Sequence, residues 1–275
     1  MNTKSILILL IILTFSSNIY GFNSDLYDIR KPIKKNIAVN LNKLENKEYL
    51  LNILEKLKKE ISKNDKTKKI FSLRSMYGLL LWYTAENKEK ESISKLNIKW
   101  AQEFLKYYPT NSFAMSMKSL FLGTYGLSQG VMNALYISNM GKKSLERAYE
   151  LGNKWQKGFA AALLGRQYFK LPPYPISFGN LKSATKFAKI SIKYQPNNAM
   201  FYEFLAEIYA YKGEVDKAIK ILNKIKEIKP KCWYDIILKN RIINNYDIFL
   251  EILKSQLKGK YNKYKYDFFM DPRIK

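Results

Sequence analysis

The feature that most constrains the fold is a pattern of aromatic, aliphatic and small residues over residues 202–230. Ala206 and Ala218 lie among large apolar residues at helical spacing, so two helices can approach closely there while the larger side chains fill the seam. Gly213 suits a turn between the helices, and Pro230 cannot continue the second one. The pattern therefore predicts a tightly packed helix pair. Its members are Tyr202, Leu205, Ala206, Tyr209, Gly213, Ala218, Leu222 and Pro230.

A second, less regular copy of this pattern precedes the first. Its members are Leu164, Gly165, Tyr168, Ala184, Ala188 and Pro196. Leu164 and Leu205, the equivalent leucines, are 41 residues apart. The extra length falls at 170–180, where three prolines forbid a continuous helix, so we expect a projecting loop. That loop is either a lid or docking element at the rim of a binding groove, or an inert insertion.

Both copies resemble the tetratricopeptide repeat (TPR), a helix pair of about 34 residues. The clearest repeats are 158–197 and 198–231. Upstream, Ala101 and Pro109 keep the spacing of Ala188 and Pro196, with Gly78 as the small residue of the partner helix. Segments 112–127 and 140–154 fit a further pair crossing at Ala148. The resemblance implies an all-α, right-handed α-solenoid of about four TPR-like pairs, with a concave groove lined by the first helix of each pair.

Apolar periodicity extends this expectation to the ends of the solenoid, which we place at 41–257. A leading helix is expected over 50–61, and a C-terminal capping helix carries the apolar face from Tyr246 to Leu257. The helices expected between them span about 68–85, 91–107, 112–127, 141–154, 157–170, 180–194, 198–212 and 215–228. Because no segment shows sustained two-residue alternation, we expect almost no sheet.

The N-terminal residues 1–21 have the organisation of a secretory signal peptide. Lys4 precedes an apolar run from Ile6 to Phe15, followed by a short polar exit that predicts cleavage after Gly21. An uncleaved membrane anchor is the alternative, although the run is about half the length of a spanning helix. Residues 22–40 are expected to form an extended leader. The mature protein is thus predicted to be exported and periplasmic or associated with the cell envelope.

The formal net charge of +25 comes almost entirely from lysine, since only six of the 48 basic residues are Arg. Nucleic-acid binding is not expected, because planar phosphate recognition favours Arg. Either the charge reflects an AT-rich genome alone, or it attracts an anionic membrane or polymer surface. The basic and aromatic tail, 258–275, has the same two interpretations: an adhesive strip, or a terminus folded onto the capping helix.

The chain lacks the histidine on which common catalytic triads and metal sites depend. It has no His and a single cysteine, Cys232, which is expected to be a small buried hydrophobe rather than a redox centre. No phosphate-binding glycine motif occurs, so no cofactor or metal is predicted. Glu203 and Glu207 lie one helical turn apart, but a catalytic pair needs burial to raise one pKa, which the sequence does not indicate. The protein is therefore expected not to be an enzyme.

The resemblance to TPR proteins implies which residues line the groove. They are Phe159, Arg166, Phe169, Lys170, Glu203, Glu207 and Tyr211, together with Ala162, Met200 and Ala210. Arg166 is expected to neighbour Glu203 or Glu207. The pair is either an ion pair between repeats or a polar clamp for a peptide or small carboxylate.

These observations predict a non-catalytic adaptor that holds an envelope protein or peptide in its groove. The alternative is a small-ligand-binding accessory protein of an envelope transport system. The chain is loosely similar to the TPR-type accessory component of bacterial tripartite (TRAP) transporters, although it lacks a cysteine for lipid attachment near the expected cleavage point. The oligomeric state does not follow from the sequence.

Overall fold

The computed structural model describes residues 55, 58–59, 67–84, 87–126, 128–129, 131–229, 239–240 and 242–256. The expected signal peptide, leader, most of the leading helix, Pro230, Cys232 and the tail lie outside these residues. Between Leu151 and Gly152 the chain divides into two compact units, which are described separately.

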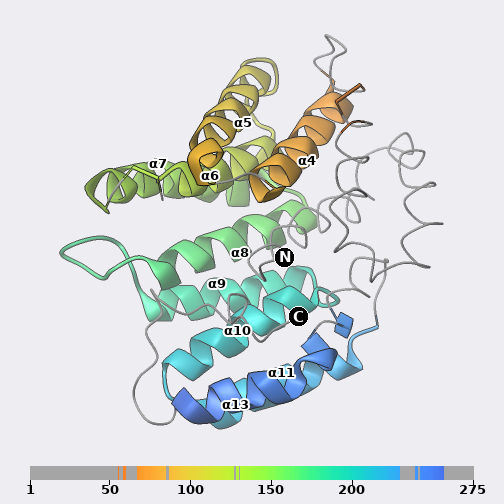
Figure 1. Cartoon of the computed structure of the whole chain (residues 1–275), viewed down its shortest axis with the longest axis vertical. Coiled ribbons are helices and arrows are strands. Elements are labelled where there is room, and N and C mark those ends of the chain that lie inside the picture. The colour runs from red at the N-terminus through yellow and green to blue at the C-terminus, as the bar shows by residue number, and fades with distance from the viewer. Residues whose placement is uncertain are drawn as a thin grey trace. The chain divides into compact units, whose positions relative to one another are not determined.

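Helices make up all the regular secondary structure of the described residues (Figure 1). The one β-type contact among them is an isolated bridge between Pro173 and Gly179. The expectation of an all-α chain with almost no sheet is confirmed for this part of the protein.

In the N-terminal unit, each helix packs against the next one along the chain. The helices are α4 (Lys68–Thr84), α5 (Asn87–Tyr107), α6 (Ser112–Gly126) and α7 (Val131–Leu151). Phe71 of α4 stacks on Phe104 of α5, with ring centroids 4.3 Å apart, and meets the edge of Phe113 of α6 at 5.9 Å. All three rings are buried, so three helices share one aromatic core.

Small residues occupy the crossing points expected in this unit. A Cβ on Gly78 would lie 1.7 Å from Oδ1 of Asn97, so a larger residue there would require the Asn97 side chain of α5 to move. Ala148 is fully buried, and its carbonyl accepts a hydrogen bond of 2.6 Å from the Ser112 hydroxyl across the α6–α7 contact.

The expected start of α7 at residue 141 is wrong by about three turns, since the helix begins at Val131. Met132, Tyr136 and Met140 lie on its exposed side, whereas Ile137 is buried. Apolar residues on both sides of the first turns hide the helical periodicity. The described helix also ends at Leu151, three residues before the expected boundary.

In the C-terminal unit the helices are α8 (Lys154–Lys170), α9 (Leu181–Tyr194), α10 (Ala199–Tyr211), α11 (Val215–Glu227) and α13 (Tyr246–Gln256). Consecutive helices from α8 to α11 pack together, and α13 packs on α11 and α10. Phe249 of α13 is fully buried, as expected for a helix that covers one end of the stack. Asn153, Asn180 and Asn198 cap the N-termini of α8, α9 and α10 by accepting backbone N–H bonds.

Gly165 lies at a close contact of α8 with both α9 and α10. A Cβ built on it would lie 3.1 Å from Cε1 of Phe204 and 3.3 Å from the backbone nitrogen of Ala188. Ala184 and Ala188 on α9 are completely buried, and so are Ala206 on α10 and Ala218 on α11. The small residues picked out by the sequence pattern are thus the contact points of the packed helices.

The turn between α10 and α11 depends on Gly213, whose φ is +75°. Its N–H donates to the carbonyl of Ala210, and the N–H of Glu214 donates to that of Tyr209, both at 2.9 Å. This is the Schellman arrangement, in which a left-handed glycine lets two final carbonyls of a helix find donors. The predicted role of Gly213 is confirmed.

The expected loop between α8 and α9 is present at 171–180 and is internally bonded. It projects beyond the ends of these helices in Figure 1. The N–H groups of Gly179 and Asn180 donate to the carbonyls of Pro172 and Tyr168, at 2.9 and 2.8 Å. A Cβ on Gly179 would lie 2.0 Å from the Leu171 carbonyl oxygen, so only glycine fits where the loop closes.

Candidate functional site

A charged cluster joins α8 to α10, the first helices of the two clearest sequence repeats. Nη1 of Arg166 lies 2.6 Å from Oε2 of Glu207, and Nζ of Lys170 lies 3.0 Å from Oε1 of the same carboxylate. Arg166 and Lys170 are one turn apart on α8, so both can reach across to Glu207. The expected pairing of Arg166 with Glu207 is present in the structure.

The three members of this cluster differ in exposure. The Glu207 side chain is completely buried, whereas those of Arg166 and Lys170 are each 27% exposed. Burying a carboxylate is costly unless it is paired and hydrogen-bonded. Glu207 therefore anchors the cluster, and the two cations are the part that reaches the surface.

Aromatic rings surround the cluster. The guanidinium carbon of Arg166 lies 5.1 Å from the centre of the Phe204 ring, and Nζ of Lys170 lies 5.2 Å from that of Phe169. Phe169 in turn meets Phe204 and Tyr211 edge-on, at 6.0 and 5.5 Å. Cation–π contact and the rings' bulk hold the two cations in defined positions.

Several residues expected to line an open groove are instead buried. Phe159 is 4% exposed, and Phe169, Glu203 and Glu207 are fully buried. Phe159 stacks on Trp155 of its own helix, with ring centroids 5.9 Å apart. Arg166, Lys170 and Tyr211 are partly exposed. The repeat pattern predicts which helix carries these side chains, but it does not distinguish surface from interior.

Phe204 is the member of the cluster that sequence reasoning missed. The signal for it lies in Gly165, because a residue without a side chain on α8 leaves room for a ring from α10. Phe204 fills that room and brings its face under Arg166. A glycine at a helix contact thus indicates a large residue on the facing helix.

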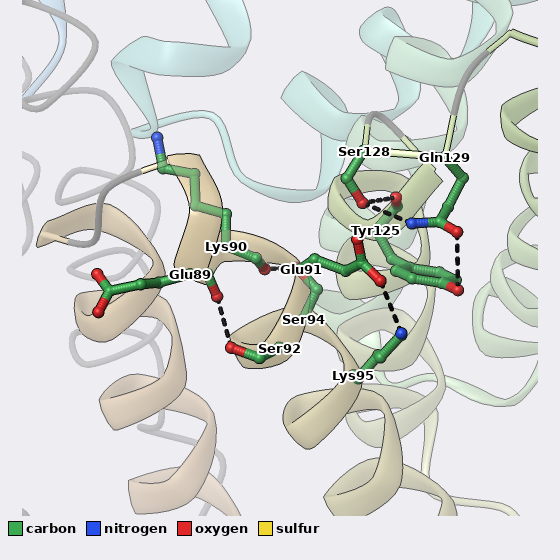
Figure 2. Close-up of polar contacts among 9 residues, drawn as sticks. All are labelled: Glu89, Lys90, Glu91, Ser92, Ser94, Lys95, Tyr125, Ser128 and Gln129. Atoms are coloured by element: carbon green, nitrogen blue, oxygen red, sulfur yellow. Dashed lines mark hydrogen bonds and ion pairs between the residues drawn. The ribbon is translucent and has the colours of Figure 1, made fainter.

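A second polar cluster links α5 to the end of α6 in the N-terminal unit (Figure 2). Nζ of Lys95 lies 2.6 Å from Oε1 of Glu91 and 5.4 Å from the centre of the Tyr125 ring. The Tyr125 hydroxyl donates to Oε1 of Gln129 at 3.1 Å. The hydrogen bond from Lys95 lowers the pKa of Glu91. Because Glu91 and Lys95 are exposed and lie four residues apart on α5, we interpret this cluster as a surface link between helices.

Within the described ranges, no three His, Cys, Asp or Glu residues gather closely enough to hold a metal ion. None of the helices in the described part is both long and apolar enough to cross a membrane.

Comparison with known proteins adds no assignment: no protein-family model matches the chain, and no curated protein is detectably similar to it in sequence. Inferences about function therefore depend on the residues and contacts described above.

Proposed function

We propose that the protein is an exported, non-catalytic adaptor of the TPR type that holds a protein or peptide of the bacterial cell envelope. In this proposal α8–α9 and α10–α11 are consecutive TPR units, and α4–α5 and α6–α7 are divergent ones. Together they would form a right-handed solenoid. The signal-like residues 1–21 support export, and the small residues at the helix contacts support the TPR interpretation.

The observation that carries the proposal is the cluster of Arg166, Lys170 and Glu207. In TPR proteins the first helices of successive pairs line the binding face, and α8 and α10 are those helices here. The cluster spans both, through contacts between residues 41 and 37 positions apart. A binding face formed by α8 and α10 would need charged side chains held in fixed positions, as they are in this cluster.

The chemistry of the cluster favours an anionic group on the partner. Glu207 and the Phe204 ring restrict the Arg166 guanidinium before any partner arrives, so less side-chain entropy is lost on binding. A planar guanidinium can bind a carboxylate through two parallel hydrogen bonds. The cations could thus bind a peptide C-terminus or an acidic side chain, with Tyr211 beside them.

A small-ligand-binding accessory protein of a transport system is the second candidate. The size of the cluster favours it, because two cations on adjacent helical turns suit a single small carboxylate as well as a peptide end. The two candidates differ in what remains bound after purification. Native mass spectrometry of the purified chain distinguishes a bound polypeptide from a bound small molecule.

The test uses two substitutions of ion-paired arginines. Arg166→Lys keeps a positive charge beside Glu207 but removes the planar fork, and we expect partner binding to fall about tenfold or more. Arg147→Lys is the matched control, since Arg147 forms an exposed pair of 3.0 Å with Glu150 on α7. Unchanged binding by Arg166→Lys, with wild-type helicity, would reject the cluster as the binding site.

A further inference from the structure

The second helix of the α8–α9 pair carries an exposed stripe of lysines. Lys182, Lys186, Lys189 and Lys193 are all exposed, whereas Ala184 and Ala188 are buried. At about 100° per residue, the four lysines fall within an arc of about 60° on the side opposite the alanines. One face of α9 is therefore a continuous strip of positive charge.

No acidic residue offsets this strip locally. Residues 151–202 contain seven Lys and one Arg but no Asp or Glu. In the part of the chain that the structure describes, none of the four lysines forms an ion pair. On α11, by contrast, Lys217 is paired with Glu214 at 2.5 Å.

The loop that leads into α9 adds apolar side chains to the start of the stripe. Tyr174 is 89% exposed and Ile176 is 65% exposed, on a loop without any charged residue between Lys170 and Lys182. Below this tip, the edge of Phe178 packs on Tyr168 with centroids 5.5 Å apart, and Asn180 caps α9 by accepting the Ser183 N–H. The loop tip is thus supported by a folded base, which ends at Asn180, two residues before Lys182.

We propose that this surface, the α9 lysines with the tip of the 171–180 loop, docks on the anionic face of a phospholipid bilayer. Charge complementarity accounts for the lysines, since each basic group near an anionic bilayer surface adds to the attraction. The loop tip favours a bilayer over a soluble polyanion. A bilayer buries Ile176 and accommodates Tyr174 at the headgroup level, whereas a soluble polyanion gives an exposed isoleucine no apolar environment.

This proposal goes beyond the adaptor function and does not depend on it. The partner cluster lies between α8 and α10, whereas the membrane surface lies on the exposed face of α9 and the preceding loop. A protein that holds a partner on one set of helices and a membrane on another would concentrate that partner at the bilayer.

The experiment measures partition of the full 275-residue chain onto vesicles. Vesicles of phosphatidylglycerol and phosphatidylcholine are compared with vesicles of phosphatidylcholine alone, at about 0.1 M salt. The ratio of the two partition coefficients is the readout, because the apolar N-terminal run contributes to both. The stripe variant replaces the four lysines with Gln, and its control replaces four other exposed lysines with Gln: Lys106, Lys143, Lys154 and Lys229.

We expect the stripe variant to lose about 30-fold or more in this ratio, and the control to lose less than about threefold. The corresponding Lys→Arg variant, which keeps the charge, should retain binding. The double variant Tyr174→Ser and Ile176→Ser should lose about fivefold on anionic vesicles at unchanged charge. Circular dichroism checks that every variant stays helical.

Two results would overturn the proposal. Equal losses in the stripe and control variants would mean that net charge alone attracts the protein to the membrane. Binding to inorganic polyphosphate that is as tight as binding to vesicles, with no effect of the loop variant, would mean a general polyanion site rather than a bilayer surface.

Discussion

Two carboxylates in the C-terminal unit each form ion pairs with two cations, but one carboxylate is buried and the other is partly exposed. Glu207 on α10 binds Arg166 and Lys170 of α8 and is completely buried. Glu214, in the turn after α10, binds Lys212 and Lys217 at 2.6 and 2.5 Å, with its side chain 25% exposed. The first arrangement connects helices distant in sequence, whereas the second closes a local turn.

The difference decides what each arrangement contributes. An exposed ion pair between near neighbours adds little, because water solvates the separated charges almost as well. A buried carboxylate has no such alternative, so losing one of its two cations leaves its charge less well compensated in the interior. We therefore expect the Glu207 cluster to be important for stability and the Glu214 cluster to be nearly dispensable.

The largest effect should come from Arg166→Ala. This substitution removes one of the two cations that pair with the buried Glu207 and leaves Lys170 in place. We expect the free energy of unfolding to fall by about 3 kcal/mol. Urea denaturation followed by circular dichroism measures it. A loss below about 1 kcal/mol would show that water reaches Glu207 and that the two carboxylates are alike.

How far the sequence predicts these two arrangements also differs. Gly213 and the turn that carries Glu214 follow from local spacing, because a glycine after a helix has a specific backbone role. The approach of Arg166 to α10 follows from repeat alignment. The pairing of Arg166 with Glu207 in particular does not, because Glu203 lies one turn away on the same helix and the sequence does not distinguish the two carboxylates.

Burial is the property that the sequence predicts least well. Phe159 and Phe169 occupy groove positions by motif alignment, yet both are buried. An aromatic side chain suits a packed interior and a binding surface equally, so residue type alone cannot decide between them. Similarly, exposed Met132 and Tyr136 obscured the first turns of α7. These outcomes depend on contacts between elements rather than on local pattern.

The second effect concerns the turn that positions Glu214. Gly213→Ala places a Cβ at φ of +75°, which costs about 1–2 kcal/mol in a non-glycine residue. Gly123→Ala is the matched control: it lies within α6, where no atom would contact the new Cβ, and should stabilise the protein by about 1 kcal/mol. Thermal unfolding midpoints that move in the same direction for both would contradict the role of the turn.

A smaller effect is expected from Lys217→Ala. The Lys217 side chain is 65% exposed, and Lys212 still pairs with Glu214 after Lys217 is removed. The free energy of unfolding should fall by less than about 1 kcal/mol, and this small loss should disappear in about 1 M salt. A salt-independent loss as large as that of Arg166→Ala would remove the distinction between the two carboxylates.

The smallest effect is the pH dependence of the Glu214 cluster. Hydrogen bonds from Lys212 and then Lys217 lower the pKa of Glu214 below its ordinary value of 4.5. The unfolded state therefore takes up this proton at higher pH than the folded state does. The stabilisation is fully present above about pH 4.5 and is lost as pH falls through the lower folded pKa. The urea midpoints of wild type and Glu214→Gln should differ at pH 7 and converge towards pH 3. A difference that is independent of pH would mean that Glu214 acts through its shape and not its charge.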